Sequence, residues 1–163
     1  MSLVILLMGV SGAGKTTVGQ LLASRLGCEF ADADDYHSPA NIAKMRAGIP
    51  LTDTDREPWL ETLQALIGDW IAAGKTAVLA CSALKQSYRD RLRVTPEVRI
   101  VYLRVSQAEL RRRLRLRQGH FMTEAMLDSQ LATLEQPDDA IQVDGECPPQ
   151  EIITSILQRL RLV

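Results

Sequence analysis

The stretch LVILLMGVSGAGKT, residues 3–16, decides the fold of this chain. Residues 3–8 form a continuous apolar run, as in a β-strand that is buried on both faces of a sheet. Residues 9–16 then match G-x-x-x-x-G-K-[ST], the pattern of a loop that cradles phosphate groups. An amphipathic helix is predicted from about Lys15 to Leu26, and Gly27 is a suitable stop. A phosphate loop requires this order of strand, loop and helix, whereas a chance glycine turn does not.

Each residue type in the loop suits the binding of phosphate. Glycines let the backbone turn tightly, so that successive N–H groups point inward beside the N-terminus of the following helix. Lys15 can reach the β- and γ-phosphates of a nucleotide, and the Thr16 hydroxyl can ligate Mg²⁺. ATP and Mg²⁺ are therefore the expected cofactors. The predicted ATP-binding residues are Gly9, Val10, Ser11, Gly12, Ala13, Gly14, Lys15, Thr16 and Thr17.

Strand and helix patterns alternate along the rest of the chain. Further strands are predicted at 29–31, 76–81, 98–103 and 140–143. Apolar residues at helical spacing predict helices from about Pro58 to Gly74 and from about 150 to 160. Because no hairpin turns separate the strands, we expect βαβ units and a parallel sheet with helices on both faces. The expected fold is a three-layer α/β/α P-loop NTPase fold. We expect one domain over residues 1–163, with substrate-binding and lid segments around the sheet.

The composition argues against several classes of protein. The 19 basic and 20 acidic residues give a net charge of -1, whereas a dedicated nucleic-acid binder is usually strongly basic. The three cysteines are far apart, which favours reduced thiols over disulfides or a zinc site. No run reaches about 18 apolar residues, and the apolar start lacks the basic flank of a signal peptide. We therefore expect a cytoplasmic protein that binds neither nucleic acid nor membranes.

An acidic cluster, Asp32-Ala33-Asp34-Asp35, follows the second predicted strand. In extended backbone Asp32 and Asp34 point to the same side, at the carboxyl end of a strand, where parallel sheets bind ligands. One carboxylate can contact Mg²⁺, and the other can accept a proton from an attacking hydroxyl. A solvated acidic turn is the alternative interpretation of this cluster.

The guanine-reading pattern N-K-x-D, which regulatory GTPases usually carry, is absent, because the only asparagine, Asn41, precedes Ile42.

Arginines crowd the stretch from 104 to 117. Arg113 and Arg117 are four residues apart and therefore share a face of a predicted helix. Such a segment, about residues 105–125, can close over a nucleotide as a lid and neutralise the phosphoryl group in transfer. A solvated basic helix is the alternative, and the lack of interleaved aromatic residues disfavours a nucleic-acid site.

A series of further motifs follows the phosphate loop. It comprises His37, Asn41-Ile42, Lys44-Met45, Gly48, Pro50-Leu51, residues 53–60, residues 81–85, residues 88–90, Gly119-His120-Phe121-Met122 and Ser129-Gln130. With the loop, the series closely resembles the gluconokinase family, from the first strand to about Pro137. The family commonly has D-G-D after the second strand, where this chain has Asp32-Ala33-Asp34. Alanine is small enough to be tolerated there, unless the position requires a positive φ.

The resemblance implies the transfer of a phosphoryl group from ATP to D-gluconate, which gives ADP and 6-phospho-D-gluconate, with Mg²⁺. It also implies a fold like those of shikimate kinase and the nucleoside monophosphate kinases, and a homodimer. A kinase for another small acid or a nucleotide is one alternative. A nucleotide-sensing module without catalysis is another, but a sensor needs neither paired aspartates nor an arginine-rich lid.

Gluconate is a carboxylate with many hydroxyl groups, and the motifs contain side chains that suit it. Arg56 and Lys85 are candidates for the carboxylate, and Asp34, His37 and Ser82 for the hydroxyls. Their alternatives are a capping ion pair for Arg56 with Asp53 or Glu57, a solvated helix start for Lys85 and a structural role for His37. The predicted catalytic residues are Lys15, Asp34, Arg113 and Arg117, with Asp34 as base or orienter near the 6-hydroxyl. The predicted Mg²⁺ ligands are Thr16 and Asp32.

Overall fold

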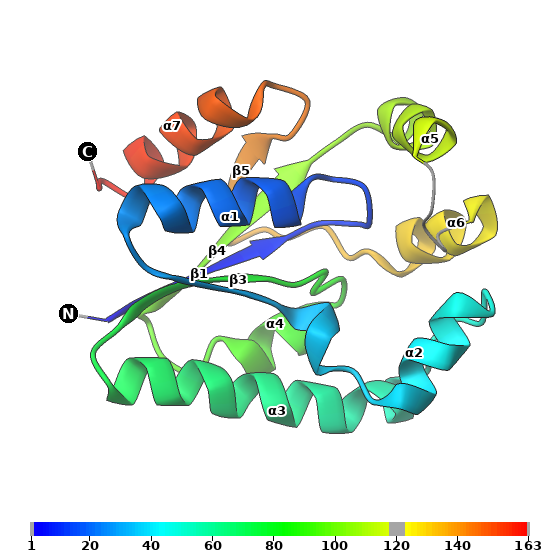
Figure 1. The fold of residues 1–163 in the computed structure, drawn as a ribbon, viewed down its shortest axis with the longest axis horizontal. Helices are drawn as coiled ribbons and strands as arrows, with labels where there is room; N and C mark the ends of the chain where they lie inside the picture. The colour runs from blue at the N-terminus through cyan, green and yellow to red at the C-terminus, as the bar shows by residue number, and fades with distance from the viewer. Residues whose placement is uncertain (1, 118–122, 163) are drawn as a thin grey trace.

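The computed structural model describes residues 2–117 and 123–162, which form a five-stranded parallel sheet with helices on both faces (Figure 1). In chain order the strands are β1 (Leu3–Met8), β2 (Glu29–Asp32), β3 (Thr76–Ala80), β4 (Val98–Arg104) and β5 (Ile141–Asp144). The helices are α1 (Lys15–Leu26), α2 (Pro39–Arg46), α3 (Asp53–Ala72), α4 (Gln86–Leu92), α5 (Gln107–Leu116), α6 (Glu124–Thr133) and α7 (Pro149–Arg159), with a 3₁₀ turn, η1 (Ala33–Tyr36). The expected α/β/α layers are confirmed. No helix in the described part combines the length and apolar character that a bilayer span requires.

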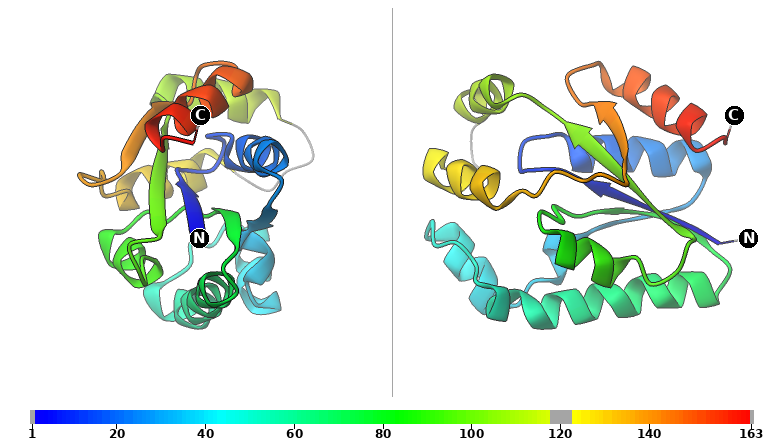
Figure 2. Two further views of the ribbon diagram at one scale, coloured as in Figure 1. Left: turned by 90° about the vertical axis from the view of Figure 1, so that its left-hand side faces the viewer. Right: turned by 180° about the vertical axis from the view of Figure 1, so that it is seen from behind.

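The sheet separates two apolar cores. Its strands follow the order β2-β3-β1-β4-β5, with every neighbouring pair parallel. One face packs against α1 and α7 and the other against α3 and α4 (Figures 1 and 2). Val4, Leu6 and Met8 of the central strand β1 enter the second core, and Ile5 and Leu7 enter the first. Both faces of β1 are therefore buried, which explains its unbroken apolar sequence.

The segments that follow the strands gather at one edge of the sheet. Because all strands are parallel, their carboxyl ends meet at this edge, where such sheets place their ligands. Figure 1 shows α2, α5 and α6 beyond it and the two chain ends at the opposite edge. The helix α5 and the start of α6 fall within the predicted lid, whereas Gly119-His120-Phe121-Met122 lies outside the described residues.

Helix α3 begins earlier than the sequence pattern predicts. The expected start is near Pro58, but the helix begins at Asp53 and contains Pro58. The N–H of Asp55 donates to Thr52 Oγ1 at 3.0 Å, and the N–H of Thr52 donates to Asp55 Oδ2 at 2.9 Å. This reciprocal capping box fixes the helix start. The N–H of Thr52 and the ammonium of Lys44 lower the pKa of Asp55 to about 2, and the Lys44–Asp55 contact at 2.9 Å joins α2 to α3.

Arg89 of α4 is a buried cation, with only 1% of its surface exposed. Its guanidinium donates to the backbone oxygens of Ala83 at 2.7 Å, Leu84 at 3.1 Å and Glu135 at 2.8 Å. These bonds join the loop after β3 to the segment after α6. Ala83 has a φ of +46°, which is unfavourable for a residue with a side chain. Arg89 thus supports a strained loop that borders the carboxyl edge of the sheet.

Replacing Arg89 by Met should lower the free energy of unfolding by about 3 kcal/mol, because buried carbonyl groups lose a charged donor. Arg91→Met is the matched control. Arg91 is partly exposed and pairs with Glu57 at 2.7 Å, so its loss should cost less than about 1 kcal/mol. Urea unfolding at pH 7 measures both variants, and equal losses would contradict the role given to Arg89.

Candidate active site

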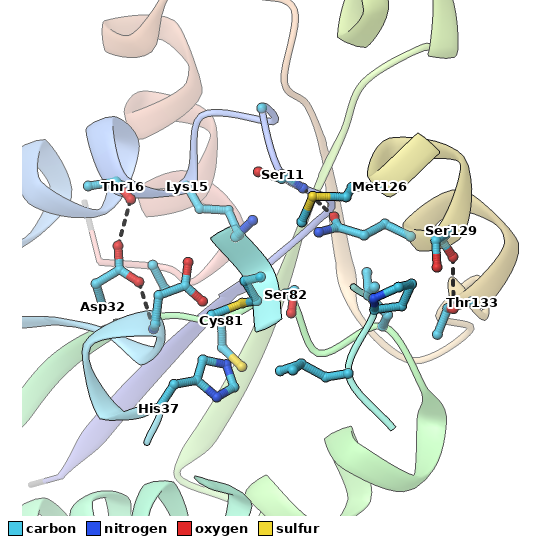
Figure 3. Close-up of a pocket in the computed structure, with 18 of the residues that line it drawn as sticks. Ser11, Lys15, Thr16, Asp32, His37, Cys81, Ser82, Met126, Ser129 and Thr133 are labelled. Carbon is cyan, nitrogen blue, oxygen red and sulfur yellow. Dashed lines mark hydrogen bonds between the residues drawn. The ribbon is translucent and has the colours of Figure 1, made fainter. Parts of the chain in front are cut away.

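A cavity of about 750 Å³ lies at the carboxyl edge of the sheet (Figure 3). Its walls come from the phosphate loop, from the segments after β2 and β3, and from α5 and α6. Among the predicted site residues, the lining includes Ser11, Gly12, Gly14, Lys15, Thr16, Thr17, Asp32, Asp34, His37, Arg56, Ser82, Arg113 and Arg117. Val10 and Ala13, also predicted to bind ATP, are buried and pack into apolar clusters behind this wall.

The phosphate loop turns from β1 into α1 through glycines with positive φ. Gly14, directly before α1, has a φ of +97°. Gly9 has a φ of +156°, and a Cβ added there would lie 3.1 Å from the carbonyl oxygen of Leu103. Only glycine therefore lets the end of β1 approach β4 this closely. The turn brings the N-terminus of α1, with its partial positive charge, to the cavity.

The Lys15 ammonium folds back over the start of the loop. Its Nζ donates to the carbonyl oxygen of Gly9 at 2.8 Å and to that of Val10 at 3.1 Å. Burial lowers the pKa of Lys15, and the nearby Asp34 carboxylate opposes this shift. A partly desolvated cation at this position is suited to meet the β- and γ-phosphates of a nucleotide.

Thr16 and Asp32 lie side by side at the start of α1 and the end of β2. The Thr16 hydroxyl donates to Asp32 Oδ2 at 2.9 Å, while Asp32 Oδ1 accepts the N–H of Asp34 at 3.0 Å (Figure 3). Hydroxyl and carboxylate oxygens are the ligands that Mg²⁺ prefers. The described residues contain no cluster of three or more His, Cys, Asp or Glu suited to a metal. One carboxylate and one hydroxyl therefore fit an ion that keeps waters and phosphate oxygens as its other ligands.

Asp34 opens onto the cavity beside Asp32. The surrounding cavity wall desolvates the carboxylate and raises the pKa of Asp34. The negative charge of Asp32 adds to the shift, whereas Lys15 opposes it. A raised pKa makes the carboxylate a better proton acceptor near neutral pH. The two aspartates thus have different surroundings, with Asp32 beside the Thr16 hydroxyl and Asp34 in the wall of the cavity.

Ala33, between the two aspartates, is fully buried. The indole N–H of Trp59 donates to the carbonyl oxygen of Ala33 at 2.7 Å and so stabilises the turn that carries the two aspartates. Among the described residues, only Ala83 and Arg161 combine a side chain with a positive φ. The alanine in place of the glycine common in the resembled family therefore causes no backbone strain here.

The imidazole of His37 stacks on the indole of Trp59, with ring centroids 4.4 Å apart and planes inclined by 12°. Burial against this ring lowers the pKa of His37 to about 4, and the positive charge of Arg56 contributes. His37 Nδ1 lies 3.4 Å from the amide nitrogen of Asn41. The ring is therefore neutral at pH 7, and it faces the cavity as a hydrogen-bonding group rather than a cation.

The two predicted carboxylate-binding cations have different surroundings. Arg56 lines the cavity, and its guanidinium donates to the Tyr88 hydroxyl at 3.1 Å. Lys85 is not part of the cavity lining, and its ammonium contacts the Asp53 carboxylate at 2.8 Å. The Tyr88 hydroxyl donates to the same carboxylate. Arg56 and Lys85 are thus linked through Tyr88 and Asp53, and the binding of gluconate by Lys85 stays a prediction.

Ser82 and Cys81 follow β3 and also line the cavity. The carbonyl oxygen of Ser82 accepts the N–H of Gly9 at 3.3 Å, which places this residue next to the phosphate loop. Burial raises the pKa of the Cys81 thiol to about 12, so the thiol stays protonated. Ser82 is therefore the hydrogen-bonding group of this segment.

Arg113 ties α5 to the phosphate loop. Its guanidinium donates to the carbonyl oxygens of Gly12 and Gly145, each at 3.0 Å, and to Glu109 at 2.8 Å. Arg117, at the end of α5, lines the same cavity. The helix ends at Leu116 and Arg117 follows it in extended backbone, so both arginines line one cavity without the shared helical face that their spacing predicts.

Comparisons with known proteins place the chain in one family. A family model described as an AAA domain matches residues 4–137. A gluconokinase of Gluconobacter oxydans is 46% identical over 161 residues, which cover 96% of this chain and 90% of that protein. The chain belongs to the gluconokinase family.

Solved structures support the same family and its fold. A gluconokinase from Sinorhizobium meliloti 1021 superposes with a TM-score of 0.86 at 43% identity, covering 98% of this chain and 92% of that chain. Shikimate kinase from Aquifex aeolicus superposes with a TM-score of 0.63 at 20% identity, covering 98% of this chain and 96% of that chain. This second likeness shows the fold alone, and it confirms the expected P-loop kinase architecture.

Within this gluconokinase-family site, sequence reasoning gave no role to the α6 wall. Met126, Ser129, Gln130 and Thr133 line the cavity from α6. Their spacing of three and four residues marks one face of a helix. Ser129-Gln130 appears among the motifs of the sequence. Its helical spacing from Met126 and Thr133 is the signal that could have placed it in the cavity wall. Apolar side chains of the segment between α2 and α3, including Ile49 and Leu51, complete the lining.

Replacing His37 by Gln should flatten the pH dependence of stability between about pH 6.5 and pH 4. The folded-state pKa of His37 is about 4, below its usual 6.5. As the pH falls through this window, the unfolded chain takes up the proton first, so the parent protein loses stability that the variant keeps. Urea unfolding at pH 7.5, 6.0 and 5.0 measures the difference. Parallel profiles for the two proteins would refute a buried, neutral imidazole.

Proposed function

We propose that this chain transfers the γ-phosphoryl group of ATP to the 6-hydroxyl of D-gluconate, which gives ADP and 6-phospho-D-gluconate. The supporting observation is that one cavity joins a phosphate loop, an aspartate pair and the cation Arg56. Membership of the gluconokinase family, with 46% identity to the Gluconobacter oxydans enzyme, specifies the acceptor. Phosphoryl transfer depends chiefly on positioning and charge neutralisation, and these residues are suited to supply both.

On the donor side, the loop N–H groups and Lys15 hold the phosphates of ATP. Thr16 Oγ1 and Asp32 Oδ2, which lie 2.9 Å apart, would hold Mg²⁺. When bound, Mg²⁺ neutralises the charge that develops on the β- and γ-phosphate oxygens. The hydrogen bond from the Asp34 N–H to Asp32 Oδ1 keeps the carboxylate turned toward Thr16.

On the acceptor side, Asp34 accepts the proton of the 6-hydroxyl or orients that group. The neutral ring of His37 and the hydroxyl of Ser82 bind other hydroxyls of the sugar acid. Arg56 binds the carboxylate, for which a guanidinium offers two parallel donors. The Lys85 ammonium also binds the carboxylate of the substrate, in place of its contact with the Asp53 carboxylate.

The segment of about residues 105–125 acts as a lid, in which Arg113 and Arg117 neutralise the phosphoryl group in transfer. The anchoring of Arg113 to Gly12 supports this role, because it holds a cation against the phosphate loop. We further propose a single-domain subunit that forms a homodimer in the cytoplasm, as the family resemblance implies. Light scattering of the purified protein tests the homodimer.

A panel of acceptors tests the reaction. Purified protein with MgATP should release ADP with gluconate well above the rate without an acceptor, and shikimate and nucleoside monophosphates should not raise that rate. A coupled assay for ADP measures each rate. If gluconate behaves like the control while another acid is phosphorylated, the substrate assignment is wrong.

Asp34→Asn should lower kcat by roughly 10²-fold or more, because it removes the proton acceptor while its size is kept. The affinity for ATP should survive. Asp69→Asn is the matched control, since Asp69 is exposed on α3 outside the cavity lining and should leave kcat within about twofold. Unchanged turnover in Asp34→Asn would remove this aspartate from the catalytic step.

A further inference from the structure

The cavity contains a contact between two distant segments that the reaction described above leaves unused. The N–H of Ser11, in the middle of the phosphate loop, donates to the side-chain oxygen of Gln130 at 2.7 Å. The dashed line at Ser11 in Figure 3 marks this bond. Gln130 lies on α6 and lines the same cavity as Asp34 and Arg56. It therefore touches the nucleotide loop from the wall of the acceptor site.

The peptide group between Val10 and Ser11 is held at both ends. Its carbonyl oxygen accepts the Lys15 ammonium at 3.1 Å, and its N–H donates to Gln130. A cation on the carbonyl side polarises the peptide and strengthens the bond on the N–H side. Lys15 is also the group that reaches the β- and γ-phosphates, so this peptide lies at the terminal-phosphate end of the loop.

A nucleotide and Gln130 need the same donor. The N–H groups of the loop bind phosphate oxygens, which are acceptors like the amide oxygen of Gln130. One N–H at 2.7 Å from the amide oxygen is not free for a phosphate. The arrival of a terminal phosphate therefore exchanges one acceptor for another and releases the glutamine side chain.

We propose that Gln130 is a positioning residue that competes with the terminal phosphate of the nucleotide for the Ser11 N–H and, once displaced, binds the acceptor. The released amide offers two donors and an acceptor, which suit a hydroxyl group. Its neighbours Ser129 and Thr133 face the same cavity and would share in binding the sugar acid. The two substrates thereby bind cooperatively. The acceptor part of this inference rests on the proposed function.

The first test is the affinity for nucleotide alone, with Gln130→Leu. This variant removes the cap but keeps a side chain of similar size. Calorimetric titration with Mg²⁺ and AMPPNP should show a dissociation constant about 2- to 10-fold lower than in the parent, the value of one net hydrogen bond. The dissociation constant of ADP, which lacks the terminal phosphate, should stay within about twofold. Gln158→Leu, an exposed site on α7, is the matched control and should change neither value.

A second variant reverses the effect. Gln130→Glu keeps an acceptor for the Ser11 N–H and adds a negative charge beside the phosphates. The dissociation constant of AMPPNP should therefore rise about 5-fold or more, opposite to the change in Gln130→Leu. A merely structural role for Gln130 would move both variants in the same direction, and thermal melting of each variant shows that it is folded.

The third measurement is the coupling between the two ligands. The coupling ratio is the dissociation constant of gluconate without AMPPNP divided by that with saturating AMPPNP. It should be about 5 or more in the parent protein, and it should lie within about twofold of one in Gln130→Leu. Gln158→Leu should keep the ratio of the parent.

Any of three results would overturn the proposal. One is an unchanged or weakened affinity of Gln130→Leu for AMPPNP, and another is a coupling ratio equal to that of the parent. An equal change for ADP and AMPPNP would likewise refute displacement by the terminal phosphate. A parent protein that turns over no gluconate would instead refute the proposed function, while the AMPPNP titrations would still decide whether Gln130 caps the loop.

Discussion

Two cations hold the carbonyl groups of the phosphate loop in the turn that its glycines allow. Lys15 takes the carbonyl oxygens of Gly9 and Val10, and Arg113 takes that of Gly12. A peptide group whose oxygen is fixed in this way also has a fixed N–H direction. The loop therefore presents a preorganised set of donors, and an anion that binds there need not reorder the backbone. The loop begins where β1 ends, and its residues form one wall of the cavity, so the position of this wall depends on β1.

Local patterns predicted the centre of the sheet and the donor half of the site. The apolar run of β1, the glycine loop and the acidic cluster each carry their signal within a few residues, and the structure places them together. Helix α2 has such a signal too, in Ser38 followed by Pro39 at the first helical position, although the apolar periodicity of so short a helix is weak. The start of α3 at Asp53 is set by the capping box of Thr52 and Asp55, whereas in the sequence Pro58 looks like the first turn of the helix.

Contacts between distant segments could not be predicted from spacing. Arg89 meets the backbone of Glu135, 46 residues away, and Gln130 meets Ser11, 119 residues away. Such pairs depend on the strand order and on where α6 packs, and neither is visible in a window of neighbouring residues. The neutral state of His37 likewise follows from its stacking on Trp59, 4.4 Å away, which only the folded chain brings about. Sequence identifies which side chains are chemically suited, and tertiary packing decides their charge state and their partners.

The strand order β2-β3-β1 has a consequence for how this enzyme family diversifies. It places the donor loop at the centre of the sheet and the segment from η1 to the start of α3 at its margin. Marginal segments tolerate insertion and replacement, whereas a loop enclosed by neighbouring strands does not. New acceptors can thus evolve by exchange of peripheral sequence, while the machinery for nucleotide stays the same.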